Sequence, residues 1–462
     1  MEWIQRRTLV ALLLATLPLQ QSYATDTLAP EPPGEAQPWL CLTGSNTIGE
    51  HLAPKFVEAF ARSQGLSLAE RRDTAPDEAT LRFKGPAQDL EAVLRFHGTG
   101  TGFAELRDRR CDLWMASRPA KPEELKTAGF RHLRSAGQEA VVALDGLAII
   151  VHPDNPVSEL TRDEVRDLFA GKLTNWSQVG GRDGPIRLHA RDDASGTFDT
   201  FKTLVLGELA ISAGASRYES TTELSRMVAV DSNAVGFVGL AGAGQNRALR
   251  IRDGDAPALA PTEFNVATED YALARRLYFY TRAERSPELS AFITFVQSEA
   301  AQKLVADVGF VPMTLTSRAV SPRADAPTEY MALVDNAERL SLSFRFGSGQ
   351  SFLDSRAARD LDRLAEFLGA PERAGTEVIL VGFTEIAESS PIVSIGHSTD
   401  RADIVAQQLV KRGVVVRHVR GFGPALPITA GNGEPARAKN RRVEVWLRRR
   451  AAPVSEPALA GS

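Results

Sequence analysis

Cysteine is scarce in this chain, which has two cysteines among 462 residues. So low a count excludes a fold held together by several disulfide bonds. A surplus of one charge is also missing, because 54 basic residues stand against 58 acidic ones and the formal net charge is −4. This balance gives no reason to expect nucleic acid as a partner. The remaining composition, 43% hydrophobic and 24% charged, is that of a soluble globular protein with two or three domains.

Sequence signatures of catalysis are missing as well. The seven histidines are scattered without the spacing of metal ligands, and no H-E-x-x-H motif, G-x-S-x-G turn or P-loop pattern occurs. We therefore expect no metal, no cofactor and no catalytic residue. One enzymatic alternative stays open, because Ser195 lies near Arg191 and could act as the nucleophile of a phosphate-ester hydrolase.

No apolar run approaches the roughly 20 residues that a membrane-spanning helix needs. The N-terminal run "TLVALLLATLPL" has 12 residues; it follows Arg6 and Arg7 and precedes small residues at Ser22 and Ala24. A basic start, a short apolar stretch and a small-x-small site are typical of a cleavable secretory signal. We predict that residues 1–24 are a signal peptide and that the mature protein is exported.

Strand-like apolar runs alternate with helical patterns through most of the chain. Alternation of this kind predicts an α/β fold with mainly parallel sheets. Residues 39–313 form the first such unit, and residues 314–339, rich in proline, serine and arginine, are interpreted as a linker. A second α/β unit covers residues 340–450, and residues 451–462 have the composition of a disordered tail.

Three strand–turn–helix corners of the first unit carry small hydroxyl residues and glycines. They are "LTGSNTIGE", "FHGTGTGFAEL" and "ARDDASGTFDTF", the last of which includes Arg191. First-turn N–H groups of a helix lack internal partners and carry partial positive charge, while glycine lets the backbone approach a ligand. The arginine guanidinium adds two parallel N–H donors that can bind an oxyanion together. Each corner alone could be an ordinary helix cap, but three that converge would form an anion pocket.

These motifs resemble PstS-type phosphate-binding proteins, the periplasmic components of phosphate ABC importers. The three corners, "DLWMASR", "NAVGFVGL" and "VADVGFVPM" occur in the family's order across residues 39–313. The resemblance implies a two-lobed α/β fold, the type II periplasmic binding protein fold, with inorganic phosphate as ligand and an ABC permease as partner. It also implies that Asp193 holds Arg191 in place. The residues that it implies at the phosphate are Ser45, Asn46, Thr47, Thr99, Gly100, Thr101, Ser117, Arg118, Arg191, Asp193, Ser195, Gly196 and Thr197.

Arg118 departs from the family pattern. In well-known members this place holds an aspartate that accepts a proton from phosphate, whereas here the sequence is "MASR". An acceptor of that kind admits protonated phosphate and repels fully deprotonated sulfate. The sequence therefore leaves open whether the ligand is phosphate or another tetrahedral oxyanion, with phosphate favoured.

The two cysteines lie on strand-like segments, Cys41 in "WLCLTGS" and Cys111 in "CDLWMAS". Export permits a disulfide bond, and the two strands are neighbours if the sheet order resembles that of the family. We predict a Cys41–Cys111 disulfide, and two buried thiols are the alternative.

The second unit resembles OmpA-like domains, which bind peptidoglycan. The segments "GFGPALPI" and "ARAKNRRVEV" carry this resemblance most strongly. In that family an aspartate and an arginine bind a diaminopimelate group. The resemblance places Glu385 and Arg401 at these two positions. The acid would bind the amine of the ligand, and the guanidinium would bind its carboxylate. The longer acid and an extra residue in the segment between them leave open an OmpA-like fold that no longer binds the wall.

The C-terminal run Arg437–Arg450 holds seven lysines and arginines against one glutamate. We interpret it as a solvated strand edge rather than a polyanion site. Taken together, the sequence predicts a periplasmic protein that captures inorganic phosphate for an ABC importer and is held at the cell wall by its second unit. The open alternative is an envelope protein that senses an anion without feeding a transporter.

Overall fold

The computed structural model describes residues 38–193, 195–254, 256–347, 353–385, 390–430 and 433–449, all within one unit, Pro38–Ser462. The predicted signal peptide and C-terminal tail lie outside the described residues. Within these ranges, no helix combines the length and the apolar character that crossing a membrane requires.

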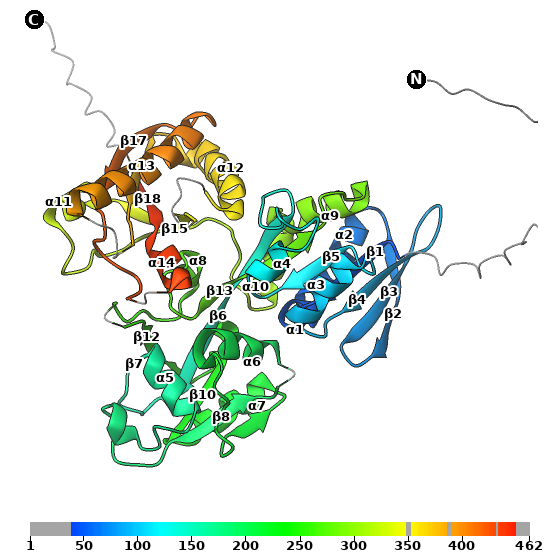
Figure 1. The fold of residues 1–462 in the computed structure, drawn as a ribbon, viewed down its shortest axis with the longest axis horizontal. Coiled ribbons are helices and arrows are strands. Elements are labelled where there is room, and N and C mark those ends of the chain that lie inside the picture. The colour runs from blue at the N-terminus through cyan, green and yellow to red at the C-terminus, as the bar shows by residue number, and fades with distance from the viewer. Residues whose placement is uncertain are drawn as a thin grey trace, which may run out of the picture. The chain divides into compact units, whose positions relative to one another are not determined.

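The first lobe contains a sheet with parallel strands at its centre (Figure 1). Strand β1 (Leu40–Gly44) pairs in parallel with β4 (Leu90–Arg95) and with β5 (Leu113–Ala116), and β13 (Ala274–Thr281) runs antiparallel to β5. The other elements of this lobe are α1 (Asn46–Gly49), α2 (Leu52–Ser63), β2 (Ser67–Ala75), β3 (Glu78–Lys84), α3 (Thr99–Arg107), α4 (Pro122–Leu125), α9 (Pro287–Val296) and α10 (Glu299–Asp307).

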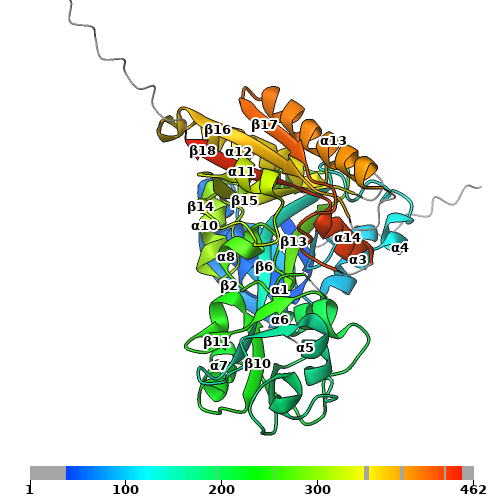
Figure 2. The same ribbon diagram turned by 90° about the vertical axis from the view of Figure 1, so that its left-hand side faces the viewer.

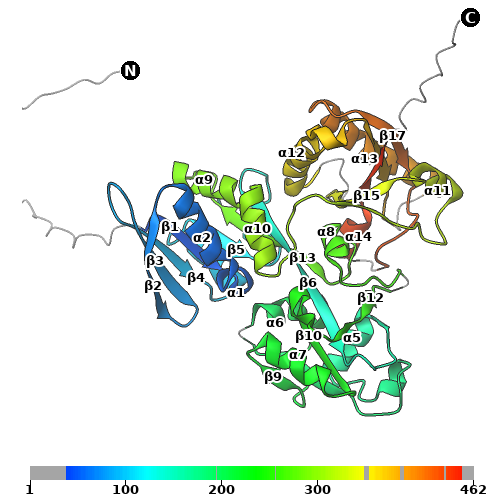
Figure 3. The same ribbon diagram turned by 180° about the vertical axis from the view of Figure 1, so that it is seen from behind.

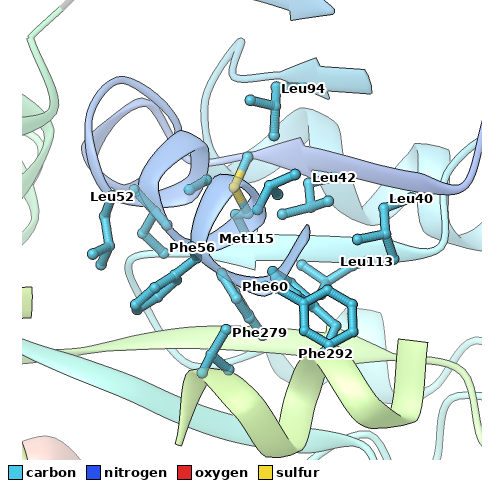
Figure 4. Close-up of a cluster of buried hydrophobic side chains, with 14 of the residues drawn as sticks. Leu40, Leu42, Leu52, Phe56, Phe60, Leu94, Leu113, Met115, Phe279 and Phe292 are labelled. Atoms are coloured by element: carbon cyan, nitrogen blue, oxygen red, sulfur yellow. The ribbon is translucent and has the colours of Figure 1, made fainter. Parts of the chain in front are cut away.

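Aromatic and aliphatic side chains fill the space between this sheet and its helices (Figure 4). Phe56 and Phe60 of α2 are buried against Phe279 of β13 and Phe292 of α9, and the ring centroids of Phe60 and Phe292 lie 5.4 Å apart. Burying such a side chain contributes roughly 1.5–3 kcal/mol. This core fixes α2, and with it the turn that joins β1 to the helices.

Strand β6 (Glu139–Val151) passes from the first lobe to the second. Its first half pairs with β13, its second half pairs with β10 (Ala234–Gly239), and all 13 of its residues are buried. Separate hydrophobic cores lie around Phe56 in one lobe and around Phe169 and Phe237 in the other. The two-lobed α/β fold is therefore as predicted, but its sheet is mixed rather than mainly parallel, because β6 and β13 run against their neighbours.

The second lobe is built around β10 and its parallel neighbour β8 (Arg187–Arg191). The rings of Phe201 and Phe237 stack with centroids 4.0 Å apart and hold α6 (Gly196–Phe201) against β10. The other elements are β7 (Glu159–Thr161), α5 (Arg162–Phe169), η1 (Trp176–Val179), η2 (Lys202–Leu206), β9 (Ser216–Tyr218), α7 (Thr221–Ala229), η3 (Leu240–Ala243), β11 (Arg247–Ala248), β12 (Arg250–Arg252) and α8 (Glu263–Ala267).

A disulfide bond joins Cys41 of β1 to Cys111, which lies just before β5. Their Cα atoms are 4.8 Å apart, although 70 positions separate them in the sequence. The parallel pairing of β1 with β5 brings the two residues together.

The C-terminal domain is a five-stranded sheet in the order β14-β15-β18-β16-β17, on which two long helices pack. Leu361 and Leu364 of the first of these helices share a buried cluster with Val405 and Leu409 of the second. The elements are β14 (Ser317–Ala319), α11 (Thr328–Val334), β15 (Glu338–Arg345), α12 (Ser355–Gly369), η4 (Pro371–Arg373), β16 (Thr376–Gly382), α13 (Pro391–Val410), β17 (Val416–Gly421), α14 (Glu434–Asn440) and β18 (Arg442–Arg449).

Two expectations about this domain differ from the structure. Much of the predicted linker is regular structure, because β14 and α11 fall within it and α11 buries Tyr330 and Val334. The basic run does not form a sheet edge, because β18 lies between β15 and β16. Its Arg442 is buried in an ion pair with Glu444 at 2.9 Å, so a carboxylate on the same strand compensates this charge.

Buried ion pairs connect the C-terminal domain to the short segment between α8 and β13. Asp270 pairs with Arg339 at 2.7 Å and with Arg345 at 3.2 Å, and Glu269 pairs with Arg356. Strand β15 and helix α8 lie side by side (Figure 3). The C-terminal domain is therefore tied to the segment that leads into β13, one of the strands at the crossing between the lobes.

Candidate functional site

The first corner lies where β1 ends at Gly44. Gly44 has a φ of +124°, and a Cβ there would lie 2.3 Å from the carbonyl oxygen of Met115, so only glycine fits. The Oγ of Ser45 is buried and has no hydrogen-bond partner in the described part of the chain. Thr47 Oγ1 accepts a hydrogen bond from Arg275 at 2.9 Å. A buried hydroxyl without a partner is costly, so this corner is suited to a polar ligand.

The second corner joins Thr99, the first residue of α3, to Ser117, which follows β5. Their hydroxyl oxygens lie 2.9 Å apart, and the Ser117 N–H donates to Thr99 Oγ1 at 3.1 Å. The Trp114 indole donates to the Thr99 carbonyl at 2.8 Å and so fixes the turn. Gly100 and Thr101 are exposed on the same first turn, where the Thr101 hydroxyl donates to a backbone carbonyl. Only Thr99 and Ser117 are therefore held inside this corner.

The third corner belongs to the second lobe. Ser195 caps α6, and its Oγ accepts a hydrogen bond from the Thr197 N–H at 3.2 Å. A Cβ on Gly196 would lie 2.4 Å from Thr47 Oγ1, so a larger residue would push the first corner away. Asn46 opens α1 and is half-buried. Helices α1 and α6 therefore meet (Figure 2), and the first and third corners come together from different lobes.

A cavity opens beside this contact, and Arg191 lies on its wall. The Arg191 guanidinium donates to Thr221 Oγ1 at 2.6 Å and to the Tyr218 carbonyl at 3.2 Å. Both acceptors are neutral, so an anion would be a stronger partner for this side chain. The predicted site residues that line the cavity are Thr47, Arg191, Ser195, Gly196 and Thr197.

Two predicted site residues engage other partners. The Arg118 guanidinium makes hydrogen bonds of 2.9 and 2.7 Å to the Glu124 carboxylate and does not line the cavity. Asp193 is 84% exposed and pairs with Arg217. The expectation that Asp193 holds Arg191 is therefore wrong in this structure, because the parallel pairing of β8 with β9 places Arg217 within reach of Asp193.

Arg275, which no sequence motif indicated, touches all three corners with its guanidinium. This side chain on β13 is 5% exposed and pairs with Asp145 of β6 at 3.2 Å. It donates to Thr47 Oγ1 at 2.9 Å, to the Gly196 carbonyl at 3.2 Å and to the Ser117 carbonyl at 3.2 Å. An arginine inside the apolar strand "RRLYFYT" was the signal that could have revealed a buried cation.

A second missed residue, Asp199, faces the same guanidinium. Its Oδ2 lies 3.7 Å from Arg275 Nη1 and accepts a hydrogen bond from the Ser117 hydroxyl at 3.0 Å. Burial lowers the pKa of Arg275, and the carboxylates of Asp145 and Asp199 oppose this shift. Asp199 therefore reaches from α6 in the second lobe to the second corner in the first lobe.

One histidine, His51, lies on the cavity wall, with its Nε2 3.5 Å from the Glu50 carboxylate. His189 of β8 is buried with its Nδ1 2.9 Å from the Tyr218 hydroxyl, and burial lowers its pKa. Among the residues that the structure describes, no group of three or more His, Cys, Asp or Glu side chains is arranged to hold a metal ion.

The two residues predicted to bind peptidoglycan lie near the end of β16. Arg401 of α13 is buried and donates to the Phe383 carbonyl at 3.4 Å. The Glu385 carboxylate pairs with Arg441, which is 1% exposed. The acid expected to bind an amine therefore already has a cationic partner, supplied by the basic run.

Comparison with known proteins divides the chain into two parts. Residues 71–300 match the PBP superfamily domain, and residues 345–441 match the OmpA family. Protein SphX of Synechococcus elongatus is 30% identical over 244 residues, which cover 50% of this chain and 72% of that protein. The phosphate-binding protein PstS of Bacillus subtilis is 28% identical over 238 residues, which cover 51% of this chain and 76% of that protein. Among solved structures, an ABC-type phosphate transport receptor from Vibrio cholerae matches with 24% sequence identity and a TM-score of 0.47. The match covers 59% of this chain and 99% of the receptor chain.

Proposed function

This chain belongs to the family of the PstS and SphX binding proteins and carries an OmpA family domain, and from that premise we propose that it captures inorganic phosphate between its three corners. The observation that carries the proposal is the meeting of the Thr47 turn with the start of α6 at the buried Arg275. An oxyanion is bound well by hydroxyl donors, helix N–H groups and a guanidinium that are shielded from water.

The proposed contacts come from each corner. Arg191 would exchange the neutral Thr221 hydroxyl for a phosphate oxygen, and hydrogen bonds to a charged acceptor are roughly twice as strong as neutral ones. The unpartnered Ser45 hydroxyl would donate to the anion, which removes the cost of leaving it unbonded. The full proposed set is Ser45, Asn46, Thr47, Thr99, Ser117, Arg191, Ser195, Gly196 and Thr197.

The proposal extends to transport and to location. The protein would release phosphate unchanged to an ABC permease, and residues 1–24 would direct its export to the periplasm. Its C-terminal domain would hold it at peptidoglycan through Glu385 and Arg401. For that contact, Arg441 must either release Glu385 or remain beside the bound amine, because the two side chains already form an ion pair.

Calorimetric titration of the mature chain tests the binding proposal. Phosphate and arsenate should each bind one anion per chain with similar affinity, because they share shape and charge. The absence of saturable phosphate binding would contradict the proposal. A parallel assay with a chromogenic phosphate ester should give no turnover, and turnover that is lost on Ser195→Ala would favour the hydrolase instead.

A further inference from the structure

A second cavity, with a volume of about 240 Å³, lies between the first lobe and the C-terminal domain. One wall comes from the start of β6, the end of β13 and helix α9, and the other wall comes from helix α12. The Ser355 hydroxyl at the start of α12 donates to the Glu139 carboxylate of β6, so the two walls are joined. This cavity shares no lining residue with the one beside Arg191. A ligand here would therefore occupy a different site from the proposed phosphate.

Arginine side chains line both walls of this cavity. Arg356, Arg359 and Arg363 are spaced by three and four residues, so they lie on one face of α12. Arg285, in the segment between β13 and α9, lines the opposite wall. The planar guanidinium group matches the geometry of phosphate and carboxylate groups. The cavity therefore offers donors for such groups from two sides.

Two buried polar atoms at this cavity have no hydrogen-bond partner in the described part of the chain. They are the hydroxyl oxygen of Thr281, which is 1% exposed, and Nη2 of Arg363, whose side chain is 15% exposed. A buried donor without a partner costs free energy. A ligand in the cavity that accepts hydrogen bonds from both atoms would remove this cost.

The arginines at the cavity are only partly balanced by protein carboxylates. Arg356 and Arg363 share the Asp360 carboxylate, at 2.8 and 2.7 Å. Arg285 is half-buried and Arg359 is exposed, and neither forms an ion pair among the residues that the structure describes. Two guanidinium charges are therefore available to an anion.

The carboxylates near the cavity are engaged elsewhere or exposed. Both oxygens of Glu139 accept from hydroxyl groups, Oε2 from Tyr280 at 2.6 Å, and burial raises the pKa of this carboxyl. In the adjoining hollow along α12, Asp362 and Glu299 form ion pairs of 2.7 and 3.1 Å with other basic residues, and Glu366 is exposed. None of these carboxylates pairs with the two arginines that lack a partner.

We propose that this cavity binds a small anion with two or more oxyanion groups, held between Arg285 on one wall and Arg359 and Arg363 on the other. Hydrogen bonds from guanidinium groups to an anion are charge-assisted and therefore strong. The Thr281 hydroxyl would donate to the same anion. Because its two walls belong to different domains, the bound anion would also hold the C-terminal domain against the first lobe.

Calorimetric titration of the mature chain with pyrophosphate tests the proposal, and we expect saturable binding of one anion per chain. Arg285→Gln and Arg359→Gln should each weaken this binding by about tenfold or more, because a charge-assisted contact is lost. Neither substitution removes the partner of a carboxylate, so both variants should fold. The matched control is Arg417→Gln, because Arg417 is 60% exposed and does not line the cavity. A parallel titration with citrate, weakened by the same substitutions, would show that carboxylate groups also bind.

Arg191→Ala separates this site from the proposed phosphate site. It should leave pyrophosphate binding unchanged, whereas the two cavity variants should leave phosphate binding unchanged. Pyrophosphate binding that is lost in Arg191→Ala and kept in the cavity variants would place the anion at the phosphate site and overturn the inference. The absence of saturable binding of both pyrophosphate and citrate would overturn it as well. A chain that binds pyrophosphate in this cavity but no phosphate would contradict the proposed function alone.

Discussion

Arg191 and Arg275 bring positive charge to the candidate site in different ways. Arg275 is buried and pairs with the Asp145 carboxylate while it donates to groups of all three corners, so it holds the corners together. Arg191 is half-buried and donates to neutral acceptors, so it can turn toward a ligand. The two residues therefore predict different consequences of mutation, a loss of architecture at Arg275 and a loss of affinity at Arg191.

Arg191→Ala should weaken phosphate binding by on the order of 2–4 kcal/mol, because a charge-assisted contact is removed from a site with little water. Titration would record this as a dissociation constant raised roughly 30-fold to several hundred-fold. Arg187→Ala is the matched control on the same strand, because Arg187 is exposed and pairs with Asp231. An Arg191→Ala titration curve identical to that of the wild type would remove Arg191 from the site.

Sequence reasoning found the residues whose role is local. Ser195 caps α6 and Gly196 is the first residue of that helix, in line with a serine-glycine turn before a helix. Arg275 escaped notice because its partners lie far away in the sequence and meet it only after β13 has paired with β6. Asp193 was misassigned because its carboxylate pairs with Arg217, while Arg191 donates to Tyr218 and Thr221 instead.

At the scale of elements, the parallel pair β1 and β5 carries the first two corners on its C-terminal ends. The Cys41–Cys111 disulfide ties β1 to the segment that leads into β5. Both corners therefore depend on how well this pair of strands is held together.

Replacing Cys41 and Cys111 with alanine together should lower the free energy of unfolding by up to about 4 kcal/mol, since the bond closes a long loop in the unfolded chain. Denaturant unfolding of the oxidised wild type and the double variant measures this difference. Thiol labelling of the unfolded, unreduced wild type should detect no free thiol. Two labelled thiols would contradict the disulfide.

The prediction of elements failed where long-range pairing decided the structure. Low periodicity in residues 314–339 suggested a linker, yet β14 gains order by pairing with β15. The basic composition of β18 suggested an edge, but the buried Glu444 pairs with Arg442, and Glu377 of β16 pairs with Arg448. Local composition contains no information about such partners, whereas the strands and helices with strong apolar patterns were evident from the sequence.

At the scale of the whole molecule, buried charges join the C-terminal domain to the segment before β13. Burial alone would raise the pKa of the Glu269 carboxyl, but Arg276, Arg356 and Arg345 outweigh it and lower this pKa to about 2. The ordinary value for this group is 4.5. Because the folded pKa lies below the unfolded one, the carboxylate stabilises the folded state above about pH 4.5, and this contribution is lost as the pH falls toward 2.

The contribution of Glu269 should therefore reach about 3 kcal/mol at neutral pH. Denaturant unfolding of the wild type and of Glu269→Gln, measured across this pH range, checks the prediction. The difference in free energy of unfolding between the two proteins should shrink as the pH falls from 4.5 toward 2. A difference that does not change with pH would show that Glu269 is not held ionised by its arginines.

The C-terminal domain should confer weak but measurable binding to peptidoglycan. Pelleting of the full chain with purified sacculi is expected for the wild type and should be lost in Arg401→Ala, because the ligand's carboxylate loses its guanidinium partner. Arg412→Ala is the control, because Arg412 pairs with Asp362 elsewhere on the domain. Equal pelleting of the wild type and Arg401→Ala would mean that this site does not hold the wall, and no pelleting of the wild type would favour a scaffold without wall binding.

The central claim is that the three corners form one site for a tetrahedral oxyanion. Crystals of the mature chain grown with arsenate test it most directly, because anomalous scattering locates the arsenic atom independently of any assumed binding mode. The account predicts one arsenate within hydrogen-bonding distance of Ser45, Arg191 and the first turn of α6. Arsenate bound only elsewhere, or crystals without bound arsenate at saturating concentration, would contradict it.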